Sequence, residues 1–214
     1  LADALADEKL ADAPFAPRPL GDFARSGELD IQTGPFGTVL QASSYAKTGT
    51  PIINPVNMVN RRLVTTDGPF LSDAECDRLA RYQMEAGDIL LARKGDVGRA
   101  VLVTPSYAGF IVGSDLMRLR LFTSEIMPEY LFGFLLSPRI RSWIARHASG
   151  TTMPGINERL LNAVLVPIPP QEYQVEMVRT LTDVDNATRS VTDSICGTDQ
   201  LLLCIADQLT EGVS

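Results

Sequence analysis

The residues most able to do chemistry lie in a short basic turn between two apolar runs. This turn combines three cations with two glycines: Arg93, Lys94, Gly95, Gly98 and Arg99. Glycines let backbone N–H groups approach an anion closely, and the cations add charged donors, so the segment could bind phosphate. A surface hairpin that is merely rich in charge would have the same composition, and both interpretations stay open here.

Side chains that catalyse reactions are scarce. His147 is the only histidine, so we expect neither a Ser/His/Asp triad nor a histidine-rich metal site. There is no Walker A, GxSxG, HExxH or DxDxDG-type motif, and the acidic residues form no recognisable nuclease pattern. The odd number of cysteines and the lack of CxxC spacing favour a reducing cytosol over zinc or disulfides. We therefore expect no catalytic residue, metal or cofactor in this chain.

Charge is distributed unevenly along the 214 residues, whose formal net charge is −7. Residues 33–170 carry 14 basic and 11 acidic groups, whereas residues 1–32 carry 3 and 7, and residues 171–214 carry 2 and 8. This asymmetry suits a middle domain that faces a polyanion and acidic ends that contact protein. Chance and a solvated helix face would explain it equally well.

Hydrophobic periodicity indicates the strands that position the basic turn. Apolar runs at 89–92 and 100–103 predict a strand–turn–strand unit. Residues 115–121 alternate between apolar and polar, which predicts a half-buried strand with a basic outer face formed by Arg118 and Arg120. Two further short strands are expected at 51–54 and 164–168.

Helices are expected between these strands. A capping-box pattern at Ser72 predicts a helix to about residue 83. Apolar helices are expected at 128–136 and 138–148, with Trp143 of the second in the core. Asn157 can cap a short helix that follows it.

The C-terminal residues 171–214 predict one long helix. Pro169 and Pro170 precede it, and no proline interrupts it before residue 211. Its apolar residues recur in steps of four and three, which is a heptad seam that needs a partner helix. Packing of the helix on its own domain is the alternative. The seam positions expected to contact the partner are Leu181, Val184, Val191, Ile195, Leu202, Ile205 and Leu209.

Together these elements predict an α/β (α+β) chain in three parts. Residues 1–19 form an N-terminal helix and linker, residues 20–170 a globular domain with a small mixed sheet and helices, and residues 171–214 the coiled-coil helix. With 45% apolar residues the chain can bury one core, and no apolar run is long enough to span a membrane. The acidic, alanine-rich start is unlike a signal peptide, so we expect a cytoplasmic protein.

Six segments in a particular order carry a resemblance to a known family. They are LGDFA at 20–24, TGPFGTVLQASSY at 33–45, GTPIINPVNM at 49–58, GDILLARKGDVGRAVLV at 87–103, PEYLFGFLLS at 128–137 and TTMPGINERLLNAVLVPIPPQEYQ at 151–174. Over about residues 20–211, the chain resembles one target recognition domain, with its spacer helix, of the specificity (S) subunit of type I restriction–modification systems. The ordered set, which ends in IPPQEYQ and a heptad helix, is specific to that family.

The resemblance implies a division of labour. Each target recognition domain binds one half of a bipartite DNA sequence through the major groove, and antiparallel spacer helices set the distance between half-sites. Methyltransferase subunits dock on the S subunit, supply S-adenosylmethionine and methylate adenine at N6, and a restriction subunit can join them. The S subunit itself has no catalytic residues.

A usual S subunit has two such domains and two long helices, whereas this chain has one of each. It is therefore expected to pair through its helix, either as a homodimer or with a second specificity half. The alternative is the C-terminal specificity region of a fused methyltransferase–endonuclease.

Cations and hydrogen-bonding side chains of the globular domain are expected to contact double-stranded DNA. They are Lys47, Arg61, Arg62, Arg93, Lys94, Arg99, Thr151, Thr152 and Asn157. Two competing hypotheses remain. A self-contained nuclease or hydrolase would cleave plasmid with Mg²⁺ alone. A pure protein-interaction module would bind the methyltransferase without selecting any duplex.

Overall fold

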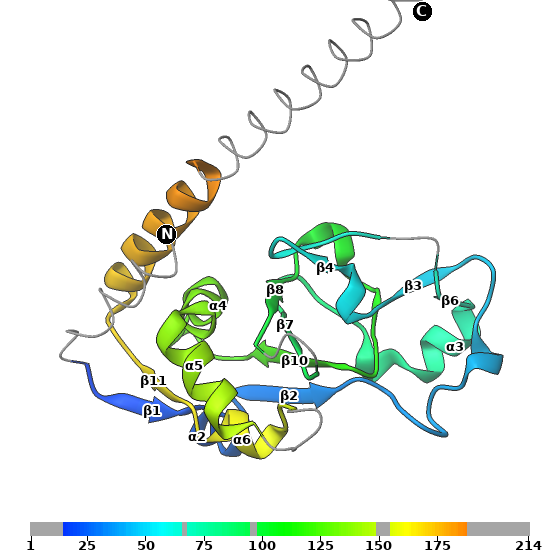
Figure 1. The fold of residues 1–214 in the computed structure, drawn as a ribbon, viewed down its shortest axis with the longest axis horizontal. Coiled ribbons are helices and arrows are strands. Elements are labelled where there is room, and N and C mark those ends of the chain that lie inside the picture. Colours follow the sequence, from blue (N-terminus) through cyan, green and yellow to red (C-terminus); the bar gives the residue numbers. More distant parts are fainter. Residues whose placement is uncertain (1–14, 66–67, 95–97, 149–154, 188–214) are drawn as a thin grey trace, which may run out of the picture.

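A computed structural model describes residues 15–65, 68–94, 98–148 and 155–187, which form a mixed α/β fold (Figure 1). At its centre lies a four-stranded sheet in the order β2-β10-β7-β8, with every neighbouring pair antiparallel. Its strands are β2 Leu29–Thr33, β10 Leu116–Leu121, β7 Ile89–Ala92 and β8 Ala100–Leu102. The expected fold class is thus confirmed, and β7 and β8 lie within one residue of the predicted strand–turn–strand unit.

Alternation along the central strands divides the core into two sides. Ile89 and Leu91 pack into a cluster with the helices, whereas Leu90 and Ala92 pack into a second cluster on the opposite face. Successive side chains of a strand point to opposite faces of the sheet, so this sheet is a middle layer that is buried on both sides.

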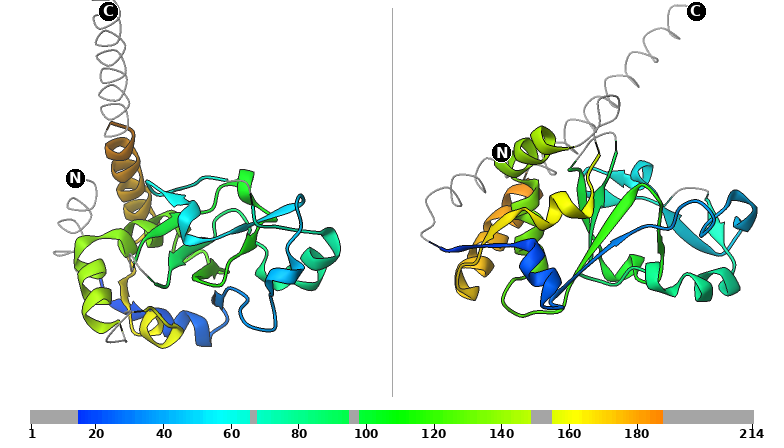
Figure 2. Two further views of the ribbon diagram at one scale, coloured as in Figure 1. Left: turned by 45° about the vertical axis from the view of Figure 1, so that its right-hand side comes forward. Right: turned by 90° about the horizontal axis from the view of Figure 1, so that it is seen from below.

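Helices gather at one end of the molecule in Figure 1, while β3, β6 and α3 lie at the other end; Figure 2 shows the same arrangement from two further directions. The helical end contains α2 Leu20–Arg25, α4 Pro128–Leu136, α5 Pro138–His147 and α6 Glu158–Asn162. Beside them β1 Pro17–Pro19 pairs antiparallel with β11 Leu165–Pro167. This pairing brings residues 17–19 into the globular part, whereas the sequence analysis placed them in a linker.

The other end is built around a three-stranded sheet in the order β6-β3-β9. Strand β3 Thr50–Ile53 is antiparallel to β6 Phe70–Leu71 and parallel to β9 Ile111–Val112. Helix α3 Asp73–Arg78 is shorter than predicted, and the Ser72 side chain makes no capping bond. Glu75 instead pairs with Arg78 at 2.6 Å. The 3-10 turns are η1 Ala42–Ser44, η2 Pro55–Asn57, η3 Ala80–Tyr82 and η4 Pro105–Tyr107.

The C-terminal helix begins at Gln171, as predicted, and is described to residue 187. Met177 is 1% exposed, and Leu181 packs on the helical core of its own globule. Leu181 therefore packs within the chain, as the alternative had it, while its contact with a partner helix stays a prediction. Val184 is half-buried, and the remaining seam positions lie outside the described residues: Val191, Ile195, Leu202, Ile205 and Leu209.

Candidate nucleic-acid interface

Arg93 follows β7 directly, at the start of the β7–β8 turn, and backbone hydrogen bonds hold it there. Arg93 N–H donates to the Asp115 carbonyl at 2.9 Å, and the Arg93 carbonyl accepts from Ile156 N–H at 2.9 Å. Its half-buried side chain reaches only two carbonyl oxygens, at 3.4 Å on Ile156 and 3.5 Å on Ser114. These long contacts are weak, and no carboxylate in the described part of the chain pairs with this guanidinium.

Lys94 and Arg99 complete the ends of the turn. Lys94 Nζ lies 3.0 Å from Asp115 Oδ1, and both side chains are about half exposed. Surface ion pairs of this kind contribute little, so phosphate can replace Asp115 at low cost. Arg99 Nη1 donates to the Met58 carbonyl at 3.2 Å, and its Nε is buried without a hydrogen-bond partner in the described residues.

A second basic loop lies next to this turn. It is a hairpin that the sequence analysis did not predict. Strands β4 Met58–Val59 and β5 Arg62–Leu63 pair antiparallel through a two-residue connection. Both connecting residues have positive φ, 48° at Asn60 and 62° at Arg61, as a type I′ turn requires. Arg62 is exposed, whereas Arg61 forms an ion pair with Asp185 of the C-terminal helix at 2.9 Å.

The bond from Arg99 to the Met58 carbonyl joins the turn to the hairpin. The structure therefore brings together four predicted DNA contacts, which we call the basic edge: Arg62, Arg93, Lys94 and Arg99. Lys47 is exposed but lies elsewhere, because its neighbour Ala46 bridges to Phe70 in the three-stranded sheet. In Figure 1, β4 lies beside β8, while β6 lies towards the far end.

Of the three polar candidates near residue 155, Asn157 lies in the described part of the chain. Asn157 caps α6, because its Oδ1 accepts from Leu160 N–H at 2.9 Å. The cap was predicted; it occupies Oδ1, and a contact with phosphate would use the Nδ2 donor instead. Thr151 and Thr152 lie outside the described residues.

Helix α5 also borders the turn, which the sequence analysis did not anticipate. A Cβ on Gly98 would lie 3.8 Å from Cγ of Arg141. Trp143 is not fully in the core, because it is half-buried and stacks on exposed His147 with ring centroids 4.4 Å apart. A signal was present in the sequence, since this helix carries three arginines and a histidine among ten residues.

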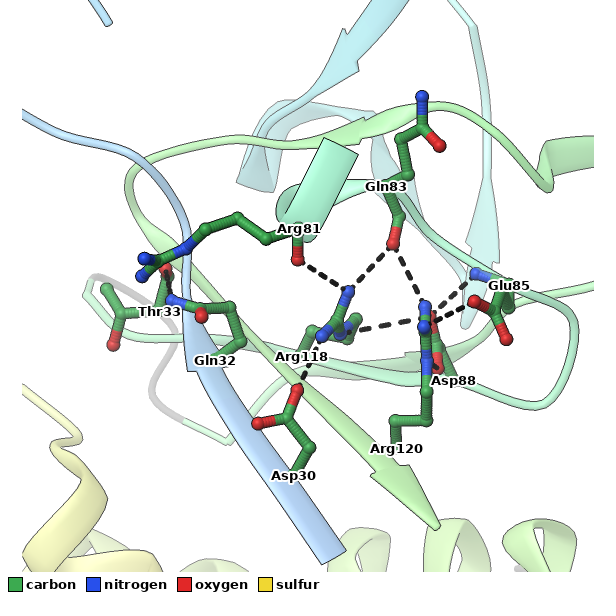
Figure 3. A network of polar contacts seen from close by, with 9 residues as sticks. All are labelled: Asp30, Gln32, Thr33, Arg81, Gln83, Glu85, Asp88, Arg118 and Arg120. Atoms are coloured by element: carbon green, nitrogen blue, oxygen red, sulfur yellow. Dashed lines mark hydrogen bonds and ion pairs between the residues drawn. The ribbon is translucent and has the colours of Figure 1, made fainter. Parts of the chain in front are cut away.

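The predicted basic outer face of β10 is wrong. Arg118 is 4% exposed and forms an ion pair with Asp30 at 2.5 Å, and it donates to the carbonyls of Arg81 and Gln83 at 3.1 and 2.7 Å (Figure 3). Arg120 binds both carboxylate oxygens of buried Asp88 at 2.7 Å. A strand that is buried on both faces must satisfy its cations internally.

These bonds also fix the charge of the network. The hydrogen bonds to Asp88 raise the pKa of Arg120 above its ordinary value, so this side chain stays cationic. Arg118 and Arg120 therefore join the strands to the segment before β7, and their charges are already balanced within the protein. The described residues contain no group of three His, Cys, Asp or Glu side chains placed to hold a metal ion. None of the described helices is both long and apolar enough to cross a bilayer.

One family model matches most of this chain. The family described as "Type I restriction modification DNA specificity domain" matches residues 29–195. A protein of Methanocaldococcus jannaschii described as "Putative type I restriction enzyme MjaX specificity subunit" is 25% identical over 155 residues, which is 70% of this chain and 36% of that protein. The chain thus spans little more than a third of this relative.

Solved structures share the fold at low sequence identity. A chain from a study of complex assembly and conformational transition of the type I R-M system has a TM-score of 0.63 at 20% identity, covering 92% of this chain and 47% of that chain. The HsdS subunit from Thermoanaerobacter tengcongensis has a TM-score of 0.60 at 18% identity, covering 90% and 44%. The S subunit from M. genitalium gives 0.55 at 13% identity, covering 89% and 44%. Since the family match extends over well more than half of the sequence, this chain belongs to the type I restriction modification DNA specificity domain family.

Proposed function

We propose that this chain is the DNA-reading half of a type I specificity subunit. Its globule binds one half of a bipartite duplex sequence, and the basic edge lies against the phosphates beside that half-site. The observation that carries the proposal is the family membership of a chain in which the four cations of the basic edge lie on two neighbouring loops. The excess of basic over acidic residues in 33–170 also supports a globule that faces DNA.

The residues of the basic edge have different parts in this proposal. Arg62 is exposed and has no partner among the described residues, so it makes a phosphate contact without giving up an existing bond. Lys94 exchanges its surface pair with Asp115 for phosphate. Arg93 and Arg99 donate hydrogen bonds to backbone carbonyls, and their remaining guanidinium N–H groups can donate to phosphate. Phosphate contacts of this kind set the register in which other side chains meet the base edges.

We propose further that the chemistry belongs to a partner. The partner is an adenine-N6 methyltransferase subunit, which supplies S-adenosylmethionine, and this chain contributes no catalytic residue. A restriction subunit can join the same assembly. The second half-site is read by another specificity half, held through the C-terminal helix, so that two half-sites lie on one face of the duplex at a set distance. An identical partner would read a two-fold symmetric site.

The phosphate role is tested by the salt dependence of duplex binding. Each lost phosphate contact lowers the slope of log K against log salt by about 0.9. We expect Arg62→Ala to lower the slope by the equivalent of about one phosphate contact. The Arg62→Ala/Lys94→Ala/Arg99→Ala variant should lower it by the equivalent of about two to three contacts. The measurement is fluorescence anisotropy with a labelled duplex across a salt series.

Arg25→Ala is the matched control, since Arg25 is equally cationic and exposed but pairs with Asp22 on α2, away from the basic edge. It should leave the slope unchanged. A triple variant with the parental slope would exclude the basic edge as a phosphate site. Loss of slope in the Arg25 variant instead would move the interface to the helical end.

The partner is tested by co-purification and by methyl transfer. The protein should co-purify with an adenine methyltransferase subunit, and the complex should transfer methyl groups from labelled S-adenosylmethionine to duplex DNA. The protein alone should transfer none. Methyl transfer or plasmid cleavage by the isolated protein would contradict the assigned division of labour.

A further inference from the structure

The C-terminal helix is anchored at its base by a fully buried amide. Gln174 is 0% exposed, and its Oε1 accepts from Met127 N–H at 2.8 Å. Its Nε2 donates to the carbonyls of Glu125 and Pro169 at 2.8 and 3.0 Å. One side chain therefore ties the first turn of the helix to the segment that leads into α4 and to the chain just before the helix.

The next two turns of the helix pack on α4. Met177 is buried in the helical core, and Leu181 reaches the one glycine of α4. A Cβ on Gly133 would lie 2.5 Å from Cδ1 of Leu181. The missing side chain at Gly133 thus permits the close approach of the two helices at this point.

A third attachment comes from a different part of the chain. Arg61, at the tip of the β4–β5 hairpin, forms its ion pair with Asp185 at 2.9 Å, and about a third of each side chain is exposed. Asp185 lies eleven residues beyond Gln174, which corresponds to about 16 Å along a helix. Two attachments separated by this distance restrict the direction of a rod far more than one attachment at its base.

The hairpin is itself rigidly held, which a positioning element requires. Met58 and Leu63 are 1% and 4% exposed. Behind them, Asn57 Nδ2 donates to the Val64 carbonyl at 2.9 Å, and Val64 N–H donates to the Asn57 carbonyl at 2.8 Å. Arg61 also adopts a positive φ, a conformation that non-glycine residues rarely adopt, so the turn presents its side chain in a defined direction.

We infer that the β4–β5 hairpin is a positioning element that sets the direction in which the C-terminal helix leaves the globule. Arg61 and Asp185 are the positioning residues. The adjacent Arg62 belongs to the basic edge, so the same two-stranded unit joins the ligand-facing loops to the helix. On the proposed function, on which this consequence rests, the hairpin thereby sets the distance between half-sites.

Distance measurements between two spin labels test the direction of the helix without DNA. One label is placed by Ala187→Cys at the last described turn of the helix, and the other by Arg159→Cys on α6; both positions are exposed. Cys196 and Cys204 are replaced by Ser, and buried Cys76 is retained. Pulsed electron paramagnetic resonance should give one narrow distance distribution for this parent protein.

Removal of either positioning residue should at least double the width of that distribution. Arg61→Asn is the preferred variant, because asparagine tolerates the positive φ of the turn but cannot reach Asp185. Asp185→Asn removes the charge on the helix, and the exchanged pair Arg61→Asp/Asp185→Arg should restore a narrow distribution. Asp22→Asn, which removes an exposed pair on α2, should leave the width unchanged.

A parental width in both Arg61→Asn and Asp185→Asn, with unchanged thermal unfolding, would overturn the inference. Duplex binding separates this result from failure of the proposed function. If the widths change as expected and the protein binds no duplex, the hairpin still orients the helix and the DNA proposal fails. If DNA binds with the parental spacer preference in Arg61→Asn and the widths do not change, only the positioning role is lost.

Discussion

Replacement of Asp88 by alanine should destabilise the protein more than any other single loss of a carboxylate in its described part. Asp88 is 1% exposed and accepts two bonds from Arg120 and one from Glu85 N–H, each at 2.7 Å. Removing one partner of a buried ion pair costs about 3–5 kcal/mol, because the other charge stays buried. Arg120 keeps the Gln83 carbonyl at 2.9 Å and the Glu85 carboxylate, so we expect a loss of about 3 kcal/mol, in the lower part of this range.

Urea unfolding followed by circular dichroism measures this loss. The midpoint should fall while the dependence of the unfolding free energy on urea stays the same, because the surface exposed on unfolding is unchanged. Asp22→Ala is the matched control, since it removes an exposed ion pair and should cost less than about 1 kcal/mol. A loss below about 1 kcal/mol for Asp88→Ala would refute the view that this network stabilises the junction of β10 with the segment before β7.

Three further predictions concern single positions. Hydrogen bonds from Ser26 and Arg18 lower the pKa of Glu28 below 4.5; its stabilisation is therefore complete above that pH and is lost as the pH falls through the lowered value. Urea midpoints at pH 6 and pH 3 should differ less in Glu28→Gln than in the parent. Gly34→Ala places a Cβ 1.9 Å from the Gly113 carbonyl oxygen, so the backbone must shift and the melting temperature should fall by at least about 5 °C. Tyr130→Phe removes a 3.0 Å bond to the Pro167 carbonyl and should cost about 1 kcal/mol in the same urea assay.

Most local elements could be predicted from the sequence because their signals are local. Prolines at the first helical positions begin α4 and α5, and both helices lie where apolar periodicity placed them. Asn157 caps α6 as its position before an apolar run indicates. The apolar pattern also located β7, β8 and β10, because alternate residues of a strand share a face.

The environment of β10 could not be predicted, because its partners are distant in the chain. Alternation correctly separates Leu119 from Arg118, but it does not say what covers the polar face. Arg118 is paired with Asp30, 88 residues away, and with carbonyls of the segment before β7. Helical periodicity likewise does not indicate whether Leu181 contacts a partner helix or α4 of its own chain.

The candidate interface was predicted in part. Charge around two glycines located the ends of the β7–β8 turn, where Arg93, Lys94 and Arg99 lie. The β4–β5 hairpin was missed because its strands have only two residues each and its turn contains no glycine. Because the hairpin was missed, the ion pair of Arg61 with Asp185 was not anticipated, and a DNA contact of Arg61 stays a prediction.

Selection of duplexes from a random library by the purified protein at about 0.15 M salt tests the central claim most directly. The account predicts enrichment of a defined sequence, bound at least about 10³-fold more tightly than unrelated duplex. It also predicts that Arg62→Ala weakens the enriched and unrelated duplexes by the same factor, because a phosphate contact carries no sequence information. Equal affinity for every duplex, or no binding at low salt, would contradict the account.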